Sequence, residues 1–157
     1  MKSIWMAIAT FCKTGYLPIA PGSWASLITA AVLFPAAIVF KPSSRLWLPL
    51  ATLPIIIIGV IAADRAEKLM GSKDPRPIVI DEVAGQMVTL WWAPISLPVY
   101  LAGFILFRIF DIFKPFPVNL VDRKVAGGWG IMLDDVLAGI YAAGVLQLIV
   151  HLCPRLA

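Results

Sequence analysis

Four stretches of this chain contain no Asp, Glu, Lys or Arg, and they limit what the chain can fold into. They cover residues 24–40, 46–63, 83–107 and 136–150. A helix needs about 20 apolar residues to cross a bilayer. The first two stretches approach that length, and the fourth is shorter but extends to Cys153 if His151 is neutral. The chain is 61% hydrophobic and 14% charged, whereas soluble domains carry about 25% charged residues. A membrane is therefore the expected solvent for this chain.

The third stretch decides the topology because Pro94 and Pro98 lie in its middle. Proline removes a helix hydrogen bond and disfavours helix in the residue before it. We therefore predict a turn at residues 93–98 between two short helices, a partly immersed hairpin whose turn is covered by protein. The alternative is one tilted span, which would put Asp81 and Glu82 on the opposite side of the membrane from Asp111.

The distribution of basic residues favours the hairpin. With the hairpin, ten basic residues share one side of the membrane and Lys41, Arg45 and Arg155 lie on the other, whereas a single span gives seven against six. Cytoplasmic loops are enriched in Lys and Arg, so the larger group is expected in the cytoplasm. The ten residues are Lys2, Lys13, Arg65, Lys68, Lys73, Arg76, Arg108, Lys114, Arg123 and Lys124.

No strand-like alternation of polar and apolar residues persists anywhere in the chain. The expected fold is thus an all-α polytopic membrane bundle, with about three full spans plus the proline-broken hairpin, and residues 1–157 forming a single integral-membrane domain. The net charge of +4 is spread over dispersed residues, so we attribute it to orientation and anionic lipid and expect no nucleic-acid binding. The apolar residues 4–12 lack a clean cleavage pattern, so they are expected to be retained.

With the hairpin, four sequence blocks that carry polar chemistry reach the same side of the membrane. The first is TGYLPIAPGS at residues 14–23, in which glycines free the backbone and prolines stiffen it. Exposed amides before a helix can bind an anion, which makes Thr14 and Gly15 candidate phosphate ligands; an ordinary interfacial turn has the same composition. The second block is Asp81-Glu82, which offers paired carboxylates, although acids at a helix start also stabilise the helix dipole.

The third block has Arg108, Asp111 and Lys114 spaced three residues apart, which puts them on one helical stripe. Alternating cations and a carboxylate suit a complex of a metal with a phosphate, and they also suit a helix-stabilising ion network. The fourth block is Asp134-Asp135, which follows the glycine-rich residues 127–130, expected to be flexible. One aspartate could cap the last helix, but a cap explains one acid more readily than two.

Together these blocks resemble the phosphatidylglycerophosphatase A family. The strings that carry the resemblance are TGYLPIAPGSWASL, PIVIDEVAGQ, LFRIFDIFKPFP and GGWGIMLDDVLAGI, which extend from about Thr14 to Ile140. The resemblance implies an integral-membrane, Mg²⁺-dependent phosphatase of phospholipid biosynthesis that converts phosphatidylglycerophosphate to phosphatidylglycerol. The positions that match the family are Asp81, Glu82, Arg108, Asp111, Lys114, Asp134 and Asp135.

The sequence lacks the motifs of several known phosphatase mechanisms. No Cys-x5-Arg loop follows Cys12, no DxDx[TV] aspartyl motif occurs, and His151 is the only histidine. Metal-assisted hydrolysis remains, and whether water or a carboxylate attacks stays open. We predict that Arg108, Lys114, Thr14 and Gly15 bind the substrate phosphate. The residues predicted to bind one or two Mg²⁺ and to carry catalysis are Asp81, Glu82, Asp111, Asp134 and Asp135.

Two other functions use similar residues. A phosphotransferase that joins a CDP-activated lipid to an alcohol also needs clustered aspartates and Mg²⁺, but its usual DG-x-x-AR motif is absent. A divalent-cation transporter would need acids near the middle of the bilayer, whereas here the acids lie at segment ends. The partners expected for the phosphatase are therefore the membrane and an anionic phospholipid substrate, with the site on the cytoplasmic side of a bacterial inner membrane.

Overall fold

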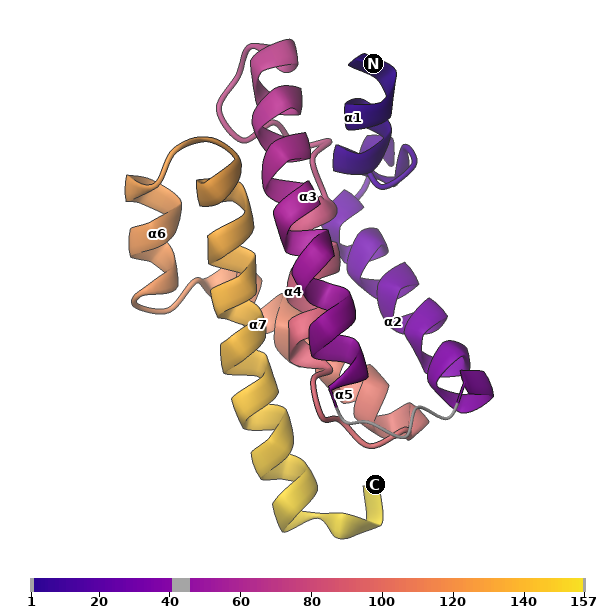
Figure 1. Ribbon diagram of the computed structural model, residues 1–157. Helices are drawn as coiled ribbons and strands as arrows, with labels where there is room; N and C mark the ends of the chain where they lie inside the picture. The colour runs from indigo at the N-terminus through magenta and orange to yellow at the C-terminus, as the bar shows by residue number, and fades with distance from the viewer. Residues whose placement is uncertain (1, 41–45, 157) are drawn as a thin grey trace.

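The computed structural model describes residues 2–40 and 46–156, and within them the chain is a bundle of seven α-helices without β-strands (Figure 1). Lys41 and Arg45, which entered the charge comparison, lie outside the described residues. The elements in chain order are α1 (Lys2–Ala9), η1 (Thr14–Tyr16), α2 (Pro21–Phe40), α3 (Trp47–Met70), α4 (Ile80–Thr89), α5 (Leu97–Phe113), α6 (Val118–Lys124), α7 (Gly127–Leu152) and η2 (Pro154–Leu156).

Three helices are long and apolar enough to cross a membrane. They comprise Pro21–Val39 of α2, all of α3 and all of α7. These are the three spans that the sequence predicts. Both α3 and α7 extend beyond the uncharged stretches, because charged residues continue α3 to Met70 and the glycine-rich segment starts α7.

The third apolar stretch forms the predicted hairpin. Helix α4 ends at Thr89, and α5 begins at Leu97 with Pro98 in its first turn. The ten residues of α4 cover about 15 Å, half of a hydrocarbon core about 30 Å thick. The two ends of the hairpin point toward the side of the bundle that holds α1 and α6, and its turn lies toward the other end (Figure 1).

The turn of the hairpin is only partly covered by protein, which differs from the prediction: Trp92, Ile95 and Leu97 are about half exposed, and the cover includes contacts of Trp91. The indole of Trp91 donates a hydrogen bond to Thr52 Oγ1 of α3 over 3.1 Å. The main-chain carbonyl oxygen of Trp91 accepts one from Gln147 Nε2 of α7, also over 3.1 Å. Backbone outside helices is tolerated at membrane depth only where protein or water satisfies it. These two contacts tie Trp91, at the start of the turn, to α3 and α7, and the bond from Gln147 satisfies its main-chain carbonyl.

Helix α4 lies at the centre of the bundle and contacts α2, α3, α5 and α7. All of its residues are buried except Glu82, which is half-buried. Its closest approach is to α7, where a Cβ added to Gly139 would lie 2.4 Å from the Gly85 carbonyl oxygen. Small residues let helix backbones approach this closely in membranes. Gly85 and Gly139 each follow an acid by four residues, so the close crossing brings Asp81 and Asp135 together one turn away.

Gly128 and Gly130 lie in the first turn of α7, where a flexible segment was expected, and Gly127 begins the helix with a left-handed backbone (φ 70°). A Cβ on Gly128 would lie 2.0 Å from the Val60 carbonyl oxygen, and one on Gly130 would lie 2.3 Å from that of Val125. The glycines therefore permit close packing of α7 against α3 and against the segment after α6. Because α7 begins at Gly127, Asp134 and Asp135 lie two turns inside the helix, and neither caps it.

The close crossing of α4 and α7 predicts different effects for two glycines of one helix. Gly139→Ala should lower the free energy of unfolding by about 1–3 kcal/mol, because the added methyl group forces the two backbones apart. At Gly144 an added Cβ has no heavy atom within 4 Å, so Gly144→Ala should be neutral or stabilise by up to about 1 kcal/mol. Denaturant unfolding in detergent micelles measures both variants, and equal changes would contradict the crossing.

Candidate active site

The starts of α2 and α4, the end of α5 and residues two turns inside α7 line a polar pocket of about 250 Å³. All seven charged residues of the predicted site line it, although they come from three segments that are far apart in sequence. The charged residues around the pocket are Asp74, Arg76, Asp81, Glu82, Arg108, Asp111, Lys114, Asp134 and Asp135. We refer to this cavity as the catalytic pocket.

Three acids form the tightest group in the catalytic pocket. Asp81, Glu82 and Asp135 each offer a carboxylate oxygen within 4.8 Å of the others. Adjacent residues of a helix point in directions about 100° apart, yet the carboxylates of Asp81 and Glu82, neighbours on α4, both reach Asp135. Carboxylates this close in apolar surroundings repel each other, and a nearby cation is the usual compensation.

Several oxygens of these acids have no protein partner. Among the described residues, buried oxygens without a hydrogen bond include Asp81 Oδ1, Glu82 Oε2, Asp134 Oδ1 and Asp135 Oδ2. Buried polar atoms in proteins are nearly always satisfied. Unpaired carboxylate oxygens gathered around one space are the donor set of a hard divalent cation such as Mg²⁺ or Ca²⁺. We refer to Asp81, Glu82 and Asp135 as the acid cluster, and its unpaired oxygens fit such an ion.

The first turn of α2 forms one wall of the pocket through Gly22. A Cβ on Gly22 would lie 1.8 Å from Glu82 Oε1, so only glycine lets the carboxylate approach this helix start so closely. The positive end of the helix dipole stabilises a negative charge at that position. The 14–23 block that the sequence singles out therefore does contact the site, but through Gly22 and not through the predicted Thr14 and Gly15.

Thr14 and Gly15 are not among the residues that line the catalytic pocket. They form η1, in which a Cβ on Gly15 would lie 1.9 Å from the Pro77 carbonyl oxygen. The same block receives a hydrogen bond from Arg76 Nη2 to the Pro18 carbonyl oxygen over 2.8 Å. The 14–23 block therefore supports the segment that leads into α4, and a phosphate-binding role for Thr14 and Gly15 stays a prediction.

Arg108 and Asp111 form an ion pair across one turn of α5. Arg108 Nη1 lies 2.6 Å from Asp111 Oδ2, and both side chains are mostly buried. The Nε of Arg108 is buried without a hydrogen-bond partner among the described residues. The guanidinium is therefore held at the pocket by Asp111 and retains donor capacity for an oxyanion.

Lys114 leaves the stripe that its spacing predicts. Its backbone has φ 41° at the end of α5, and Nζ lies 2.8 Å from Asp122 Oδ1 and 2.5 Å from Asp134 Oδ2. Burial lowers the pKa of Lys114, but the hydrogen bonds to Asp122 and Asp134 outweigh it and hold the pKa above its usual range. Lys114 is thus cationic, and it joins α6 to α7 beside the acid cluster.

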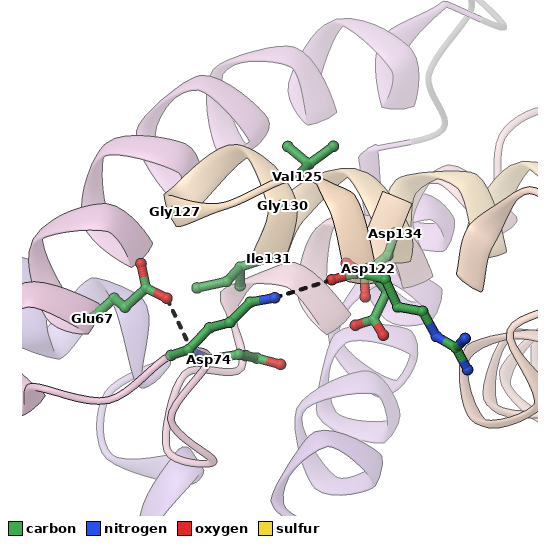
Figure 2. A pocket seen from close by; sticks show the side chains of 10 residues that line it. Glu67, Asp74, Asp122, Val125, Gly127, Gly130, Ile131 and Asp134 are labelled. Atoms are coloured by element: carbon green, nitrogen blue, oxygen red, sulfur yellow. Dashed lines mark hydrogen bonds between the residues drawn. The ribbon is translucent and has the colours of Figure 1, made fainter. Parts of the chain in front are cut away.

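A second polar cavity of about 380 Å³ adjoins the catalytic pocket and shares Asp74 and Asp134 with it (Figure 2). The main-chain N–H of Asp74 donates to Glu67 Oε1 over 3.0 Å, and Lys73 Nζ donates to the Asp122 carbonyl oxygen over 3.4 Å. The cavity gives the acid cluster a polar route toward α6 and the end of α3.

Sequence reasoning missed three residues that contribute to these cavities. Asp74 and Arg76 line the catalytic pocket, and Asp122, which resembles a surface charge beside Arg123 and Lys124, pairs with Lys114. The charged KDPRP segment directly before the Asp81 helix was the available signal for the first two. Nothing local to Asp122 indicates its partner.

Comparison with known proteins gives one family. The family model described as phosphatidylglycerophosphatase A matches residues 7–150, which include every residue of the predicted site. The chain belongs to this family. It is accordingly a phosphatase, as the resemblance of the sequence blocks implies. No solved structure matches the chain.

The relatives span nearly the same length as the chain. The phosphatidylglycerophosphatase A of Escherichia coli (strain K12) is 39% identical over 98% of this chain and 88% of its own length. The phosphatidylglycerophosphatase A of Haemophilus influenzae is 38% identical over 82% and 78%. A protein of Bacteroides thetaiotaomicron provisionally named phosphatidylinositol-3-phosphatase is 34% identical over 86% of both chains. The family match therefore includes all or most of every α-helix except α1, of which it covers the last residues.

The ion pair of Lys114 predicts a contrast with an exposed lysine. Lys114→Met leaves Asp134, which is 6% exposed, without its cation, and breaking a buried pair costs about 3 kcal/mol. Lys68→Met removes a pair with Asp64 whose side chains are 72% and 37% exposed, which costs less than about 1 kcal/mol. Unfolding in detergent micelles measures both variants. Losses of similar size would mean that Lys114 does not stabilise the buried Asp134.

Proposed function

We propose that this chain hydrolyses the terminal phosphomonoester of phosphatidylglycerophosphate, giving phosphatidylglycerol and inorganic phosphate, in a Mg²⁺-dependent reaction. The family and two of its relatives carry the name of this activity. The observation that supports it most is the catalytic pocket, in which five predicted carboxylates meet Arg108 and Lys114 at the ends of apolar helices. We take residues 1–157 as one functional domain.

The donor set of the pocket supports a metal ion. Asp81, Glu82 and Asp135 are the proposed ligands. Asp111 and Asp134 line the same pocket, and we propose that they complete the set or hold a second ion. All five are hard oxygen donors. Four of them, all except Asp111, carry a buried oxygen without a hydrogen-bond partner among the described residues. When bound, Mg²⁺ would polarise the phosphomonoester and lower the pKa of a coordinated water.

The protein's own cations act on the phosphate. Arg108 presents a buried N–H beside the acids, and a guanidinium binds phosphoryl oxygens through directed hydrogen bonds. Lys114 offsets charge on Asp134, and we propose that it also meets the transferred phosphoryl group. Which group attacks phosphorus, a water or a carboxylate, and which acid acts as general base are left open.

The distribution of charge supports a cytoplasmic site in a bacterial inner membrane. The catalytic pocket lies at the end of the bundle where Arg76, Arg108 and Lys114 also lie, and basic residues concentrate on the cytoplasmic side of membrane proteins. Substrate made in the inner leaflet would reach the pocket without crossing the bilayer.

A second candidate substrate comes from the relative provisionally named phosphatidylinositol-3-phosphatase. A phosphate on an inositol ring is also a lipid phosphomonoester, so the same acids and cations could act on it. A side-by-side assay separates the two substrates by their values of kcat/KM.

Phosphate release by detergent-purified protein tests the proposal. With Mg²⁺, phosphatidylglycerophosphate should yield phosphatidylglycerol and phosphate, and a chelator should stop the reaction. Asp135→Asn should reduce kcat by at least about 100-fold while the protein stays folded, because the substitution removes one of several repelling charges. Asp64→Asn, at an acid paired with the exposed Lys68, is the matched control and should retain activity. Near-normal turnover by Asp135→Asn, or release that persists in chelator, would refute the metal role.

A further inference from the structure

An apolar groove of about 240 Å³ runs between α2 and α5, separate from the polar cavities. Its walls include Leu27, Ala31 and Phe34 of α2, and Leu97, Leu101 and Phe104 of α5. On each helix these residues follow a four-then-three spacing, which places them on one stripe. The small side chain of Ala31 leaves the groove open between the larger residues.

The groove and the catalytic pocket lie on the same stripe of α5. Phe104 is followed four residues later by Arg108 and three residues after that by Asp111, both of which line the catalytic pocket. One face of α5 therefore changes from apolar to charged at Arg108. From Asp111 to Leu97 the stripe extends about 21 Å along the helix axis.

Helix α2 shows the same change in the opposite direction along the chain. Pro21 and Gly22 at its start line the catalytic pocket, and Leu27 begins the groove less than two turns later. The Phe34 and Tyr100 rings meet edge to face with centroids 5.3 Å apart, which joins the two walls away from the pocket. The two helices thus flank one path that is charged at one end and apolar along the rest.

We propose that this groove binds an acyl chain of the phospholipid substrate while the phosphate occupies the catalytic pocket. The inference rests on the proposed function and names the part of the protein that holds the lipid tail. The match is chemical, because a phospholipid is itself charged at one end and apolar along the rest. The volume is below the roughly 300–1,000 Å³ of pockets that enclose whole ligands, so the groove holds part of one chain.

The groove acts on substrate position more than on affinity. Leu97 and Leu101 are about half exposed, and inside a bilayer other lipid tails would cover them equally well, so burial there gives little net driving force. A chain lying along α5 instead fixes the headgroup in line with Arg108. Small errors in substrate position reduce catalytic rates strongly. A substitution that fills the groove is therefore a sharper test than one that shortens a side chain of its wall.

Two variants of neighbouring residues on α2 test the groove. Ala31→Phe fills it, whereas Val32→Phe adds the same ring at a side chain that is 60% exposed and does not line the groove. With dioleoyl phosphatidylglycerophosphate, Ala31→Phe should lower kcat/KM about tenfold, and Val32→Phe should change it less than about twofold. With the dihexanoyl lipid, whose chains barely enter the groove, both variants should resemble the unsubstituted protein. Equal loss on both lipids, or no loss on either, would overturn the proposal.

Crosslinking tests binding without turnover. A phospholipid with a diazirine in its acyl chain should label peptides containing residues 27–34 and 97–104, and excess phosphatidylglycerophosphate should suppress the label while phosphatidylcholine does not. Label elsewhere, or equal competition by both lipids, would overturn the groove. Specific labelling by a protein that releases no phosphate would instead uphold the groove and refute the proposed reaction.

Discussion

The close crossing of α4 and α7 is the contact on which the rest of the structure depends. Gly139 approaches the Gly85 carbonyl so closely that a methyl group cannot fit between them. One turn away, the same crossing brings Asp81 and Glu82 of α4 against Asp135 of α7. Helices separated by larger side chains would keep these acids apart. Two glycines, each four residues after an acid, therefore determine the geometry of the acid cluster.

The acid cluster opposes folding unless its charges are balanced, because buried like charges are costly. The protein itself neutralises two neighbouring acids of the pocket, because Lys114 pairs with Asp134 and Arg108 pairs with Asp111. The group of Asp81, Glu82 and Asp135 has no cation of its own in these ion pairs, and a divalent ion is the natural counter-charge. On the proposed function, a phosphate substrate would add negative charge to the same pocket, and a bound divalent ion and the two cationic side chains would offset it together.

Much of this arrangement could be predicted from the sequence, because the decisive signals are local. The uncharged stretches predicted the spans, and Pro94 and Pro98 predicted the hairpin. The hairpin in turn predicted that Asp81 and Asp111 lie at the same end of the bundle. Helical spacing put Arg108 beside Asp111. The spans and the Arg108–Asp111 pair need only residues within a few turns of each other, whereas the hairpin also rests on how basic residues are distributed along the chain.

The features that escaped prediction depend on contacts between distant segments. Lys114 turns from its helical stripe to Asp122 and Asp134 because α5 ends there and α6 lies beside it. In the first turn of α7, Gly128 packs on α3 and Gly130 packs on Val125, the residue that follows α6. Gly22 rather than Gly15 meets the acid cluster, a choice that composition within one loop cannot reveal.

Mn²⁺ binding, followed by electron paramagnetic resonance in detergent micelles, tests most directly whether the α4–α7 crossing builds a cation site. Gly139→Ala keeps all five predicted carboxylates and changes only the crossing, while Gly144→Ala is its control on the same helix. The account predicts that the unsubstituted protein and Gly144→Ala bind Mn²⁺ alike and that Gly139→Ala binds it at least about tenfold more weakly. Equal affinity in all three, or no binding by the unsubstituted protein, would contradict the account.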